Sequence, residues 1–486
     1  QGGFQEVEQM NLFKDMVCYQ EEVRDPSRMA EVLNRVIEKA IRGSAPAQIN
    51  VPRDYWTQVV DIELPPIVRF ERQGGGKTAI DKAAKILSEA KFPVILSGAG
   101  VVIGNAIEDC KKLAEKLDAP VCNGYQHNDS FPGSHPLAVG PLGYNGSKAA
   151  MELIAKADVV LALGTRLNPF STLPGYGIDY WPKKATIIQV DMNPDRIGLT
   201  KKVTVGICGD AKMVSQQLLE KLAPNAGENG REDRKNLIHQ TKSSWLQTLT
   251  SLDHEDDDPG TVWNKEARER DKDRMSPRQA WRAIQAGMPD DVIISSDIGN
   301  NCAIGNAYPT FEKGRKYLAP GLFGPCGYGF PSILGAKIGC PETPVIGFAG
   351  DGAFGISMNE MSSCAREDWP AISMVIFRNY QWGAEKRNSI LWFDDNFVGT
   401  ELDPELSYAK VATACGLKGV TVKTMEETTK AIKQSCEDQK KGITTFIEVI
   451  LNQELGEPFR RDAMKKPVKV AGINKGDMKP QKSLVN

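Results

Sequence analysis

The stretch Pro344-Val-Ile-Gly-Phe-Ala-Gly-Asp-Gly-Ala353 decides the fold of this chain. Its apolar run ends in Gly350-Asp351-Gly352 and a helix-like pattern follows, which is typical of a buried strand turning into a helix. Because ligands of parallel sheets bind at the carboxyl ends of the strands, we expect a phosphate-bearing ligand beside Asp351. Flanking glycines let backbone N–H groups approach an anion, and a carboxylate suits Mg²⁺, which prefers oxygen ligands.

A second apolar run, residues 373–377, ends in Arg378-Asn379-Tyr380-Gln381. Asn379 follows Asp351 by 28 positions, which leaves room for one crossover helix between two parallel strands. Neighbouring strand ends would then place the Asn379 amide beside the Asp351 carboxylate. Taken singly, a Gly-Asp-Gly turn and an Asn cap are common structural features. Only their joint spacing favours a metal site.

The rest of the chain alternates short apolar runs with amphipathic stretches, which predicts an α/β fold with doubly wound parallel sheets. We expect helices over residues 25–41 and 80–90. We expect strands at residues 93–96, 159–163, 186–190, 292–295, 345–348, 373–377 and 445–450.

The 486-residue length suggests about three domains. A proline- and glycine-rich stretch at 63–77 and a run of mixed charges at 253–274 are the expected boundaries. The second is interpreted as a solvated linker face without a functional role. We therefore predict an incomplete first α/β domain at 1–62, a central domain at 75–252, a C-terminal domain at 275–455 and a basic tail at 456–486.

Composition argues against several classes of partner. The net charge is −2 with basic residues spread along the chain, so no nucleic-acid partner is expected. No apolar run approaches the roughly 20 residues of a membrane span, and the start does not resemble a signal peptide. The ten cysteines form no C-x-x-C pair, which is typical of reduced thiols in a cytoplasmic protein.

The segment from Gly350 to Gln381 resembles the fingerprint of thiamine-diphosphate enzymes, Gly-Asp-Gly followed by about thirty residues and Asn-Asn. It departs from that pattern in having Arg378 for the first Asn and a slightly longer spacing. The resemblance implies thiamine diphosphate and Mg²⁺ as cofactors. It implies as metal ligands Asp351, Asn379 and the backbone carbonyl of Gln381, and as cofactor contacts Gly350, Gly352 and Ala353.

Two further segments resemble the same family. The stretch Ser296-Asp-Ile-Gly-Asn-Asn301 is similar to the loop that holds the diphosphate, which implies contacts from Asp297, Gly299, Asn300 and Asn301. The stretch 321–330 is similar to the glycine-rich turn that supports the bent cofactor. There the Gly324 carbonyl would meet the aminopyrimidine, and Cys326 would be an apolar wedge between the two rings. Without the resemblance, Cys326 is interpreted as a buried core thiol.

The stretches 2–10, 378–401 and 456–461 resemble the sulfoacetaldehyde acetyltransferase group of this family. That group converts sulfoacetaldehyde and phosphate into acetyl phosphate and sulfite. The resemblance implies that the full-length protein is a homodimer or homotetramer. Both reactants are anions, so Lys386 and Arg387, just past the metal loop, are candidates for the substrate pocket; surface charges on a helix are the alternative. Phe4 and Gln5 are candidates by analogy with the Phe-Gln segment of acetolactate synthases.

Family members activate the cofactor through a glutamate in the N-terminal domain. Gln1 resembles a point well inside that domain, so we expect an N-terminally truncated chain that lacks about a hundred residues of it. None of Glu6, Glu8, Glu21 or Glu22 lies in a matching motif, so the activating glutamate is expected outside this chain. As given, the chain is expected to be inactive or poorly soluble. Two alternatives stay open: an acetolactate synthase or 2-oxoacid decarboxylase of the same family, and a non-catalytic regulatory or binding subunit.

Overall fold

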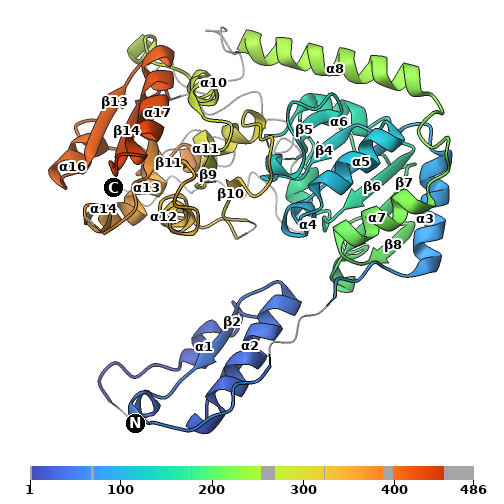
Figure 1. Ribbon diagram of the computed structural model, residues 1–486. Coiled ribbons are helices and arrows are strands. Elements are labelled where there is room, and N and C mark those ends of the chain that lie inside the picture. The colour runs from blue at the N-terminus through green and yellow to red at the C-terminus, as the bar shows by residue number, and fades with distance from the viewer. Residues whose placement is uncertain are drawn as a thin grey trace, which may run out of the picture. The chain divides into compact units, whose positions relative to one another are not determined.

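The computed structural model describes residues 3–66, 71–143, 145–176, 178–252, 269–321, 323–366, 368–386 and 398–453. The chain divides into unit 1, Gln1–Arg72, and unit 2, Gln73–Asn486. Figure 1 shows two parallel sheets in unit 2, each packed against helices, and a small helix-and-strand unit 1. The predicted α/β fold with parallel sheets is confirmed. No helix in the described ranges combines the length and the apolar character needed to cross a membrane.

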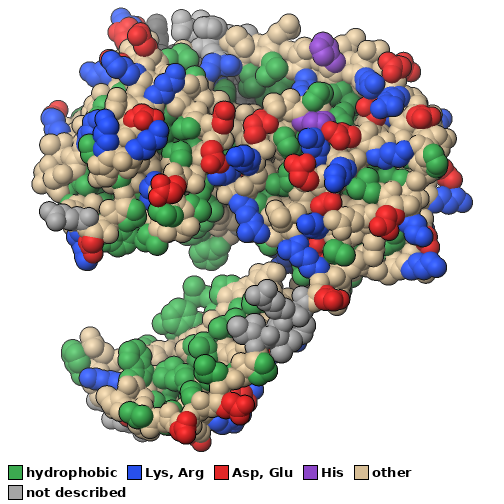
Figure 2. All heavy atoms as spheres, viewed as in Figure 1, with side chains coloured by type: hydrophobic (Ala, Val, Ile, Leu, Met, Phe, Trp, Pro, Cys, Tyr) green, Lys and Arg blue, Asp and Glu red, His purple; other side chains and the backbone are tan. Residues whose placement is uncertain are grey.

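Unit 1 is a single β-α-β arrangement with a parallel strand pair. The elements are α1 (Gln9–Phe13), β1 (Tyr19–Glu22), α2 (Met29–Gly43) and β2 (Ala47–Asn50), with short 3₁₀ turns at Pro26–Arg28 and Arg53–Thr57. Asp25 caps the first turn by accepting a hydrogen bond from the Ser27 N–H, so the helix predicted over 25–41 begins as 3₁₀ and continues as α2. Leu33, Ile37 and Ile41 form an exposed stripe on α2, and Figure 2 shows apolar side chains gathered over this unit.

The first sheet of unit 2 has six parallel strands in the order β5-β4-β3-β6-β7-β8. The strands are β3 (Pro93–Ser97), β4 (Val121–Asn123), β5 (Ala138–Pro141), β6 (Val159–Leu163), β7 (Thr186–Asp191) and β8 (Val205–Cys208). Around it lie α3 (Lys77–Glu89), α4 (Ala99–Ile103), α5 (Ile107–Leu117), α6 (Lys148–Ile154), α7 (Ala211–Lys221) and α8 (Arg231–Leu252). Every residue of β3 and β6 is buried, as expected for central strands covered on both faces.

The second sheet also has six parallel strands, in the order β10-β9-β11-β12-β14-β13. The strands are β9 (Ile293–Ser296), β10 (Tyr317–Leu318), β11 (Val345–Gly350), β12 (Ser373–Arg378), β13 (Lys418–Val422) and β14 (Thr445–Ile450). Its helices are α10 (Pro277–Gly287), α11 (Asn300–Ile304), α12 (Gly329–Gly339), α13 (Asp351–Ser357), α14 (Met361–Cys364), α16 (Tyr408–Ala414) and α17 (Met425–Gln439). Ser276 and Gln279 form a capping box that fixes the start of α10.

A buried polar seam joins the two sheets within unit 2. The Asn306 carboxamide oxygen accepts from the Gln126 N–H at 3.1 Å, and Asn128 donates to the Asn306 carbonyl at 2.9 Å. Asp129 accepts the Lys316 N–H at 2.9 Å just before β10. The C-terminal sheet is therefore tied to the central one by buried and partly buried hydrogen bonds. The bounds of the three predicted domains stay predictions, and the predicted tail at 456–486 lies outside the described residues.

Candidate cofactor and metal site

The candidate site lies where the strand order of the second sheet reverses. From β9 the chain moves to β10 on one side and then returns to β11 on the other (Figure 1). Asp297, Asp351 and Asn379 each follow the last residue of β9, β11 and β12 in turn. Since β11 and β12 pair in parallel with Gly350 beside Phe377, the structure brings Asp351 and the 378–381 loop together, as the spacing predicts. Such a switch point is the usual ligand site of an open α/β sheet.

Asp351 is buried, and its two carboxylate oxygens differ in their donors. Oδ2 accepts from Arg378 Nη1 at 3.1 Å and from the Tyr380 N–H at 2.9 Å, whereas Oδ1 accepts only from the Gly352 N–H at 2.9 Å. Burial raises the pKa of Asp351 to about 6, against the opposing charge of Arg378. Oδ1 therefore keeps the greater capacity to bind a cation.

Asn379 and Gln381 carry buried amide oxygens without a partner. Asn379 Oδ1 and Gln381 Oε1 accept no hydrogen bond, while Gln381 Nε2 donates to the Gln453 carbonyl at 2.9 Å. A buried, unsatisfied oxygen costs about 1–3 kcal/mol, which a bound cation would relieve. Tyr380 between them has φ +59°, a left-handed conformation that tends to occur at functional sites.

This metal candidate is a mixed carboxylate and amide set. Over the parts of the chain that the structure describes, no group of three or more His, Cys, Asp and Glu side chains could hold a metal ion. Oxygen donors from an aspartate, an asparagine amide and a backbone carbonyl match the preference of Mg²⁺ for hard ligands. The buried unpaired oxygen of Asn379 makes the set fit that ion, and the ligand roles stay predictions.

Asp297 uses both carboxylate oxygens to organise its own surroundings. Oδ1 accepts from the N–H groups of Ile298 at 2.7 Å and Gly327 at 3.0 Å, and Oδ2 accepts from Gly329 N–H at 2.8 Å. Burial raises the pKa of Asp297, and these backbone donors oppose the shift. The carboxylate thus ties the loop after β9 to the turn that carries Gly324. If Asp297 contacts the cofactor directly, as predicted, one of its carboxylate oxygens must bind a cofactor group in addition to these backbone N–H groups.

The loop after β9 has open backbone and unpaired polar atoms. Gly299 has φ +134°, and a Cβ added there or at Gly350 would meet no protein atom within 4 Å. Asn300 Nδ2 and Asn301 Oδ1 are buried without hydrogen-bond partners. Trp281 Nε1 donates a hydrogen bond to the Asn301 carbonyl at 2.6 Å. Bare backbone beside the unpaired Asn300 donor fits an anion such as a diphosphate, whereas the unpaired Asn301 oxygen fits a donor or a cation.

The glycine-rich turn places Cys326 at the surface. Cys326 is exposed, so its interpretation as a buried core thiol is wrong. Gly324 has φ +61°, which a glycine adopts without strain. Across the site, a Cβ at Gly352 would lie 2.6 Å from the indole of Trp382, so the side chain of Trp382 packs against bare backbone. Ala353, in α13, is buried.

The four residues predicted to line the substrate pocket differ in where the structure places them. Lys386 lies just after the metal loop, and its Nζ pairs with Glu401 Oε1 at 2.5 Å. Arg387 lies outside the described residues. Phe4 is 94% exposed and Gln5 has φ +64°, both in unit 1. The structure therefore places Lys386 near the metal loop with its charge already paired, and the pocket roles of all four stay predictions.

Several supporting residues were missed by the sequence analysis. Asp271 is buried and pairs with Arg270 and Arg274 at 2.8 Å each, and it accepts the Gln453 N–H at 3.2 Å. The interpretation of residues 253–274 as a solvated linker face is therefore wrong at Asp271; residues 253–268 lie outside the described part. Gln453 also donates to Glu401 at 2.9 Å. No spacing in the sequence links these distant segments.

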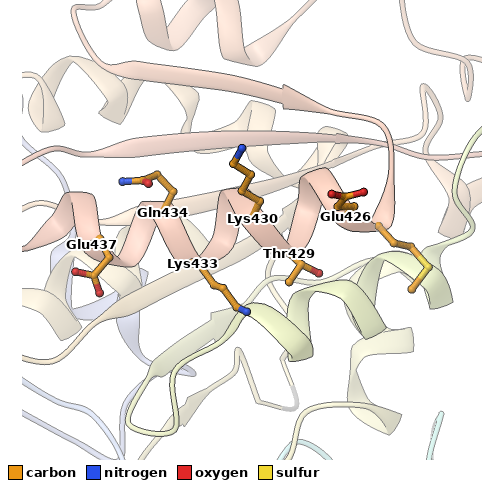
Figure 3. Close-up of a pocket in the computed structure, with 7 residues that line it drawn as sticks. Glu426, Thr429, Lys430, Lys433, Gln434 and Glu437 are labelled. Atoms are coloured by element: carbon orange, nitrogen blue, oxygen red, sulfur yellow. The ribbon is translucent and has the colours of Figure 1, made fainter.

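A separate hollow of about 570 Å³ runs along α17. Figure 3 shows Glu426, Thr429, Lys430, Lys433, Gln434 and Glu437 on successive turns of this helix. None of the predicted site residues lines it. Its mixed charges and its place on the outer surface of one helix give it no connection with the site at the strand ends.

Comparison with known proteins identifies both sheets of unit 2. Residues 80–218 match the thiamine pyrophosphate enzyme central domain, and residues 297–449 match the C-terminal thiamine-pyrophosphate-binding domain. The chain is 77% identical over 484 residues to a Rhizobium meliloti protein named "Probable sulfoacetaldehyde acetyltransferase", covering 100% of this chain and 82% of the relative. It is 73% identical to the sulfoacetaldehyde acetyltransferase of Roseovarius nubinhibens, covering 99% and 80%, and 68% identical to that of Rhodobacter capsulatus, covering 99% and 82%.

Proposed function

The chain belongs to the thiamine-diphosphate enzymes, in the group of the sulfoacetaldehyde acetyltransferases, and we propose that it converts sulfoacetaldehyde and phosphate into acetyl phosphate and sulfite. The observation that carries the proposal is the 77% identity, which extends over the whole chain and so includes both loops of the site. The unpaired buried oxygen of Asn379 beside Asp351 supports a metal-dependent cofactor at the same place.

The proposed reaction balances without an external oxidant or reductant. The aldehyde carbon rises to the oxidation level of an acyl group, and the neighbouring carbon exchanges its bond to sulfur for a bond to hydrogen. The electron pair of the broken carbon–sulfur bond leaves with sulfite, and a phosphate oxygen forms the new bond to the acyl carbon. Thiamine diphosphate, the cofactor of this family, supplies the electron sink that such a rearrangement needs.

Within the site, the chain's own residues bind and orient. We assign Mg²⁺ to Asp351, Asn379 and the Gln381 backbone carbonyl, and the diphosphate to the loops that begin at Asp297 and Gly350. The other predicted cofactor contacts are Gly299, Asn300, Asn301, Gly324, Cys326, Gly352 and Ala353. The open backbone at Gly299 and Gly350 and the unpaired Asn300 Nδ2 support the diphosphate site, and the unpaired Asn379 Oδ1 supports the metal site.

Both reactants are anions, and we assign Lys386 and Arg387 to their recognition. Lys386 lies close to the metal loop in the sequence and keeps its ammonium group in a largely buried position against Glu401. Replacing Lys386 or Arg387 by Ala should raise KM for phosphate or sulfoacetaldehyde. The matched control is Glu401→Gln, which removes the competing carboxylate and should not raise KM. Unchanged kinetics in both alanine variants would remove these cations from the pocket.

Four further assignments concern the rest of the substrate pocket, the oligomeric state, the location and the domain bounds. We propose Phe4 and Gln5 as part of the substrate pocket, a homodimer or homotetramer as the active form, and a cytoplasmic location. We also propose domain boundaries at 1–62, 75–252, 275–455 and 456–486. Size-exclusion chromatography with light scattering on the intact protein would test the oligomeric state, and a monomer would contradict it.

The function itself is tested by product analysis with the intact protein, thiamine diphosphate, Mg²⁺, sulfoacetaldehyde and phosphate. We expect sulfite and acetyl phosphate in equal amounts, and the loss of both in Asp351→Ala. Carbon dioxide from pyruvate without sulfite would identify an acetolactate synthase or 2-oxoacid decarboxylase instead. Cofactor binding without turnover of either substrate would identify a non-catalytic subunit.

A further inference from the structure

Arg378, the last residue of β12, is fully buried beside the candidate metal site. Its Nη1 donates to Asp351 Oδ2 at 3.1 Å. Its Nη2 donates to the carbonyls of Asp403 and Leu406, the second at 3.1 Å. Its Nε lies 3.9 Å from Glu448 Oε1, an ion-pair distance. One guanidinium thus links the end of β11, the 403–406 segment and the middle of β14.

Arg378 also acts on the loop that follows it. Its guanidinium carbon lies 4.2 Å from the centre of the Tyr380 ring, a cation–π geometry, and Arg274 lies over that ring at 4.8 Å. Tyr380 has φ +59°, a conformation that costs about 1–3 kcal/mol in a residue with a side chain. In that conformation the Tyr380 N–H donates to Asp351 Oδ2, the same oxygen that Arg378 holds.

The charge of Arg378 is balanced by carboxylates that are themselves fixed. Glu448 is buried, with Oε2 accepting from Ser407 Oγ at 2.6 Å and from Thr421 Oγ1 at 3.2 Å. Its Oε1 accepts the Tyr408 N–H at 3.1 Å. A buried charge pair held by further hydrogen bonds is rigid, because moving any member would leave a desolvated charge without its partner. Arg378 therefore has a single well-defined position.

We propose that Arg378 is a positioning residue of the metal site, which fixes the Asp351 carboxylate and the left-handed Tyr380. By holding Oδ2 together with the Tyr380 N–H, it leaves Oδ1 for the cation. By covering the Tyr380 ring, it sets the direction of the two flanking residues, Asn379 and Gln381. An asparagine at position 378 is too short to reach Asp351 and the 403–406 carbonyls together. The inference rests on the proposed metal site and assigns Arg378 no contact with the ion.

The test measures metal binding rather than turnover. Mn²⁺ replaces Mg²⁺, and the free ion is followed by electron paramagnetic resonance in the presence of saturating thiamine diphosphate. We expect Arg378→Gln to weaken Mn²⁺ binding by about 10–100-fold, as is typical when a group that orients a metal ligand is lost. Arg378→Lys keeps a cation beside Asp351 and should recover part of that loss. Circular dichroism and thermal melting of each variant report its folding.

The matched control is Thr424→Ala, which removes the N-cap of α17 without touching Arg378, Asp351, Tyr380 or Glu448. It should lower the melting temperature and leave the Mn²⁺ affinity unchanged. Wild-type affinity in Arg378→Gln, or an equal loss in Thr424→Ala, would overturn the positioning role while leaving the metal site intact.

A wild-type protein that binds no Mn²⁺ with the cofactor would overturn the metal site and this inference together. If Arg378→Gln does not fold, Arg378→Lys decides. A partial loss of Mn²⁺ affinity that Thr424→Ala does not share supports the positioning role, and wild-type affinity or a loss matched by Thr424→Ala overturns it.

Discussion

Asp351→Asn is expected to make the metal-free protein more stable at neutral pH. Burial raises the pKa of Asp351 from 3.8 to about 6, even with Arg378 beside it. A carboxyl whose pKa is raised on folding binds its proton more tightly in the folded state. The folded state of the protein is therefore favoured at low pH, and the protein loses stability as the pH rises from 3.8 towards 6. Asparagine has the shape of the protonated acid and escapes that loss.

The magnitude follows from the size of the shift. The difference 6 − 3.8 = 2.2 pKa units corresponds to about 3 kcal/mol at pH 7 and above. An amide oxygen can take the place of Oδ2 and accept from Arg378 and Tyr380. The amide nitrogen then faces the Gly352 N–H, which costs about 1 kcal/mol. The net gain of about 2 kcal/mol corresponds to a rise of about 4–8 °C in melting temperature for a domain of about 150–250 residues, the size class of the predicted C-terminal domain at 275–455.

The assay is calorimetry in a metal chelator at pH 7.5 and at pH 4.5. The advantage of Asp351→Asn should appear at pH 7.5 and shrink at pH 4.5, where the wild-type carboxyl is mostly protonated. Adding thiamine diphosphate and Mg²⁺ at 100 times their dissociation constant should stabilise only the wild type, by about 2.7 kcal/mol. The order of the two proteins would then reverse. A variant less stable than the metal-free wild type at pH 7.5, or a difference independent of pH, would refute the reasoning.

Two further predictions concern other parts of unit 2. Gly329→Ala should lower the free energy of unfolding, measured by urea denaturation, by about 1–3 kcal/mol, because its Cβ would lie 2.7 Å from a backbone carbonyl oxygen. The control is Gly335→Ala on the same helix. Its Cβ would meet nothing within 4 Å, so the free energy of unfolding should rise by up to about 1 kcal/mol. Equal effects at the two glycines would contradict the contact argument. Burial lowers the pKa of His127 to about 4. The folded state therefore loses stability as the pH falls from 6.5 towards 4. His127→Gln should remove up to about 3 kcal/mol of that loss. The control is the exposed His239→Gln, and a pH–stability profile that stays the same in His127→Gln would show that the ring is not buried in solution.

The strands that the sequence predicted are the ones with long apolar runs. The range 159–163 agrees with β6 and 445–450 with β14, and the others differ at their ends by one or two residues. The short strands β1, β2, β4, β5, β8, β10 and β13 were missed. In β13, Lys418-Gly-Val-Thr-Val422 mixes polar and apolar residues because it lies at the edge of the sheet and buries only part of its surface.

The site was predictable only where one rule of topology applies. Because the ends of adjacent parallel strands meet, the spacing of Asp351 and Asn379 was enough to predict that the ends of β11 and β12 lie side by side. Glu448 lies in the middle of a strand expected from its apolar neighbours, and its burial depends on the register that sets it beside Ile376 and Thr421. Asp271 precedes its partner Gln453 by 182 positions. Such contacts depend on the finished fold, and no local pattern contains them.

The two buried charge groups explain how the 378–381 loop can hold unpaired oxygens. On one side, Arg378 is fixed by Asp351 and Glu448. On the other, Asp271 binds the Gln453 N–H while the Gln453 carbonyl accepts from Gln381. With both sides held, the loop cannot turn Asn379 Oδ1 towards another donor without breaking the contacts of Arg378 or of Gln453. Asn379 Oδ1 therefore stays unpaired in the metal-free protein. A cation that binds it together with Asp351 and the Gln381 backbone carbonyl gains affinity because no ordering of the loop is required.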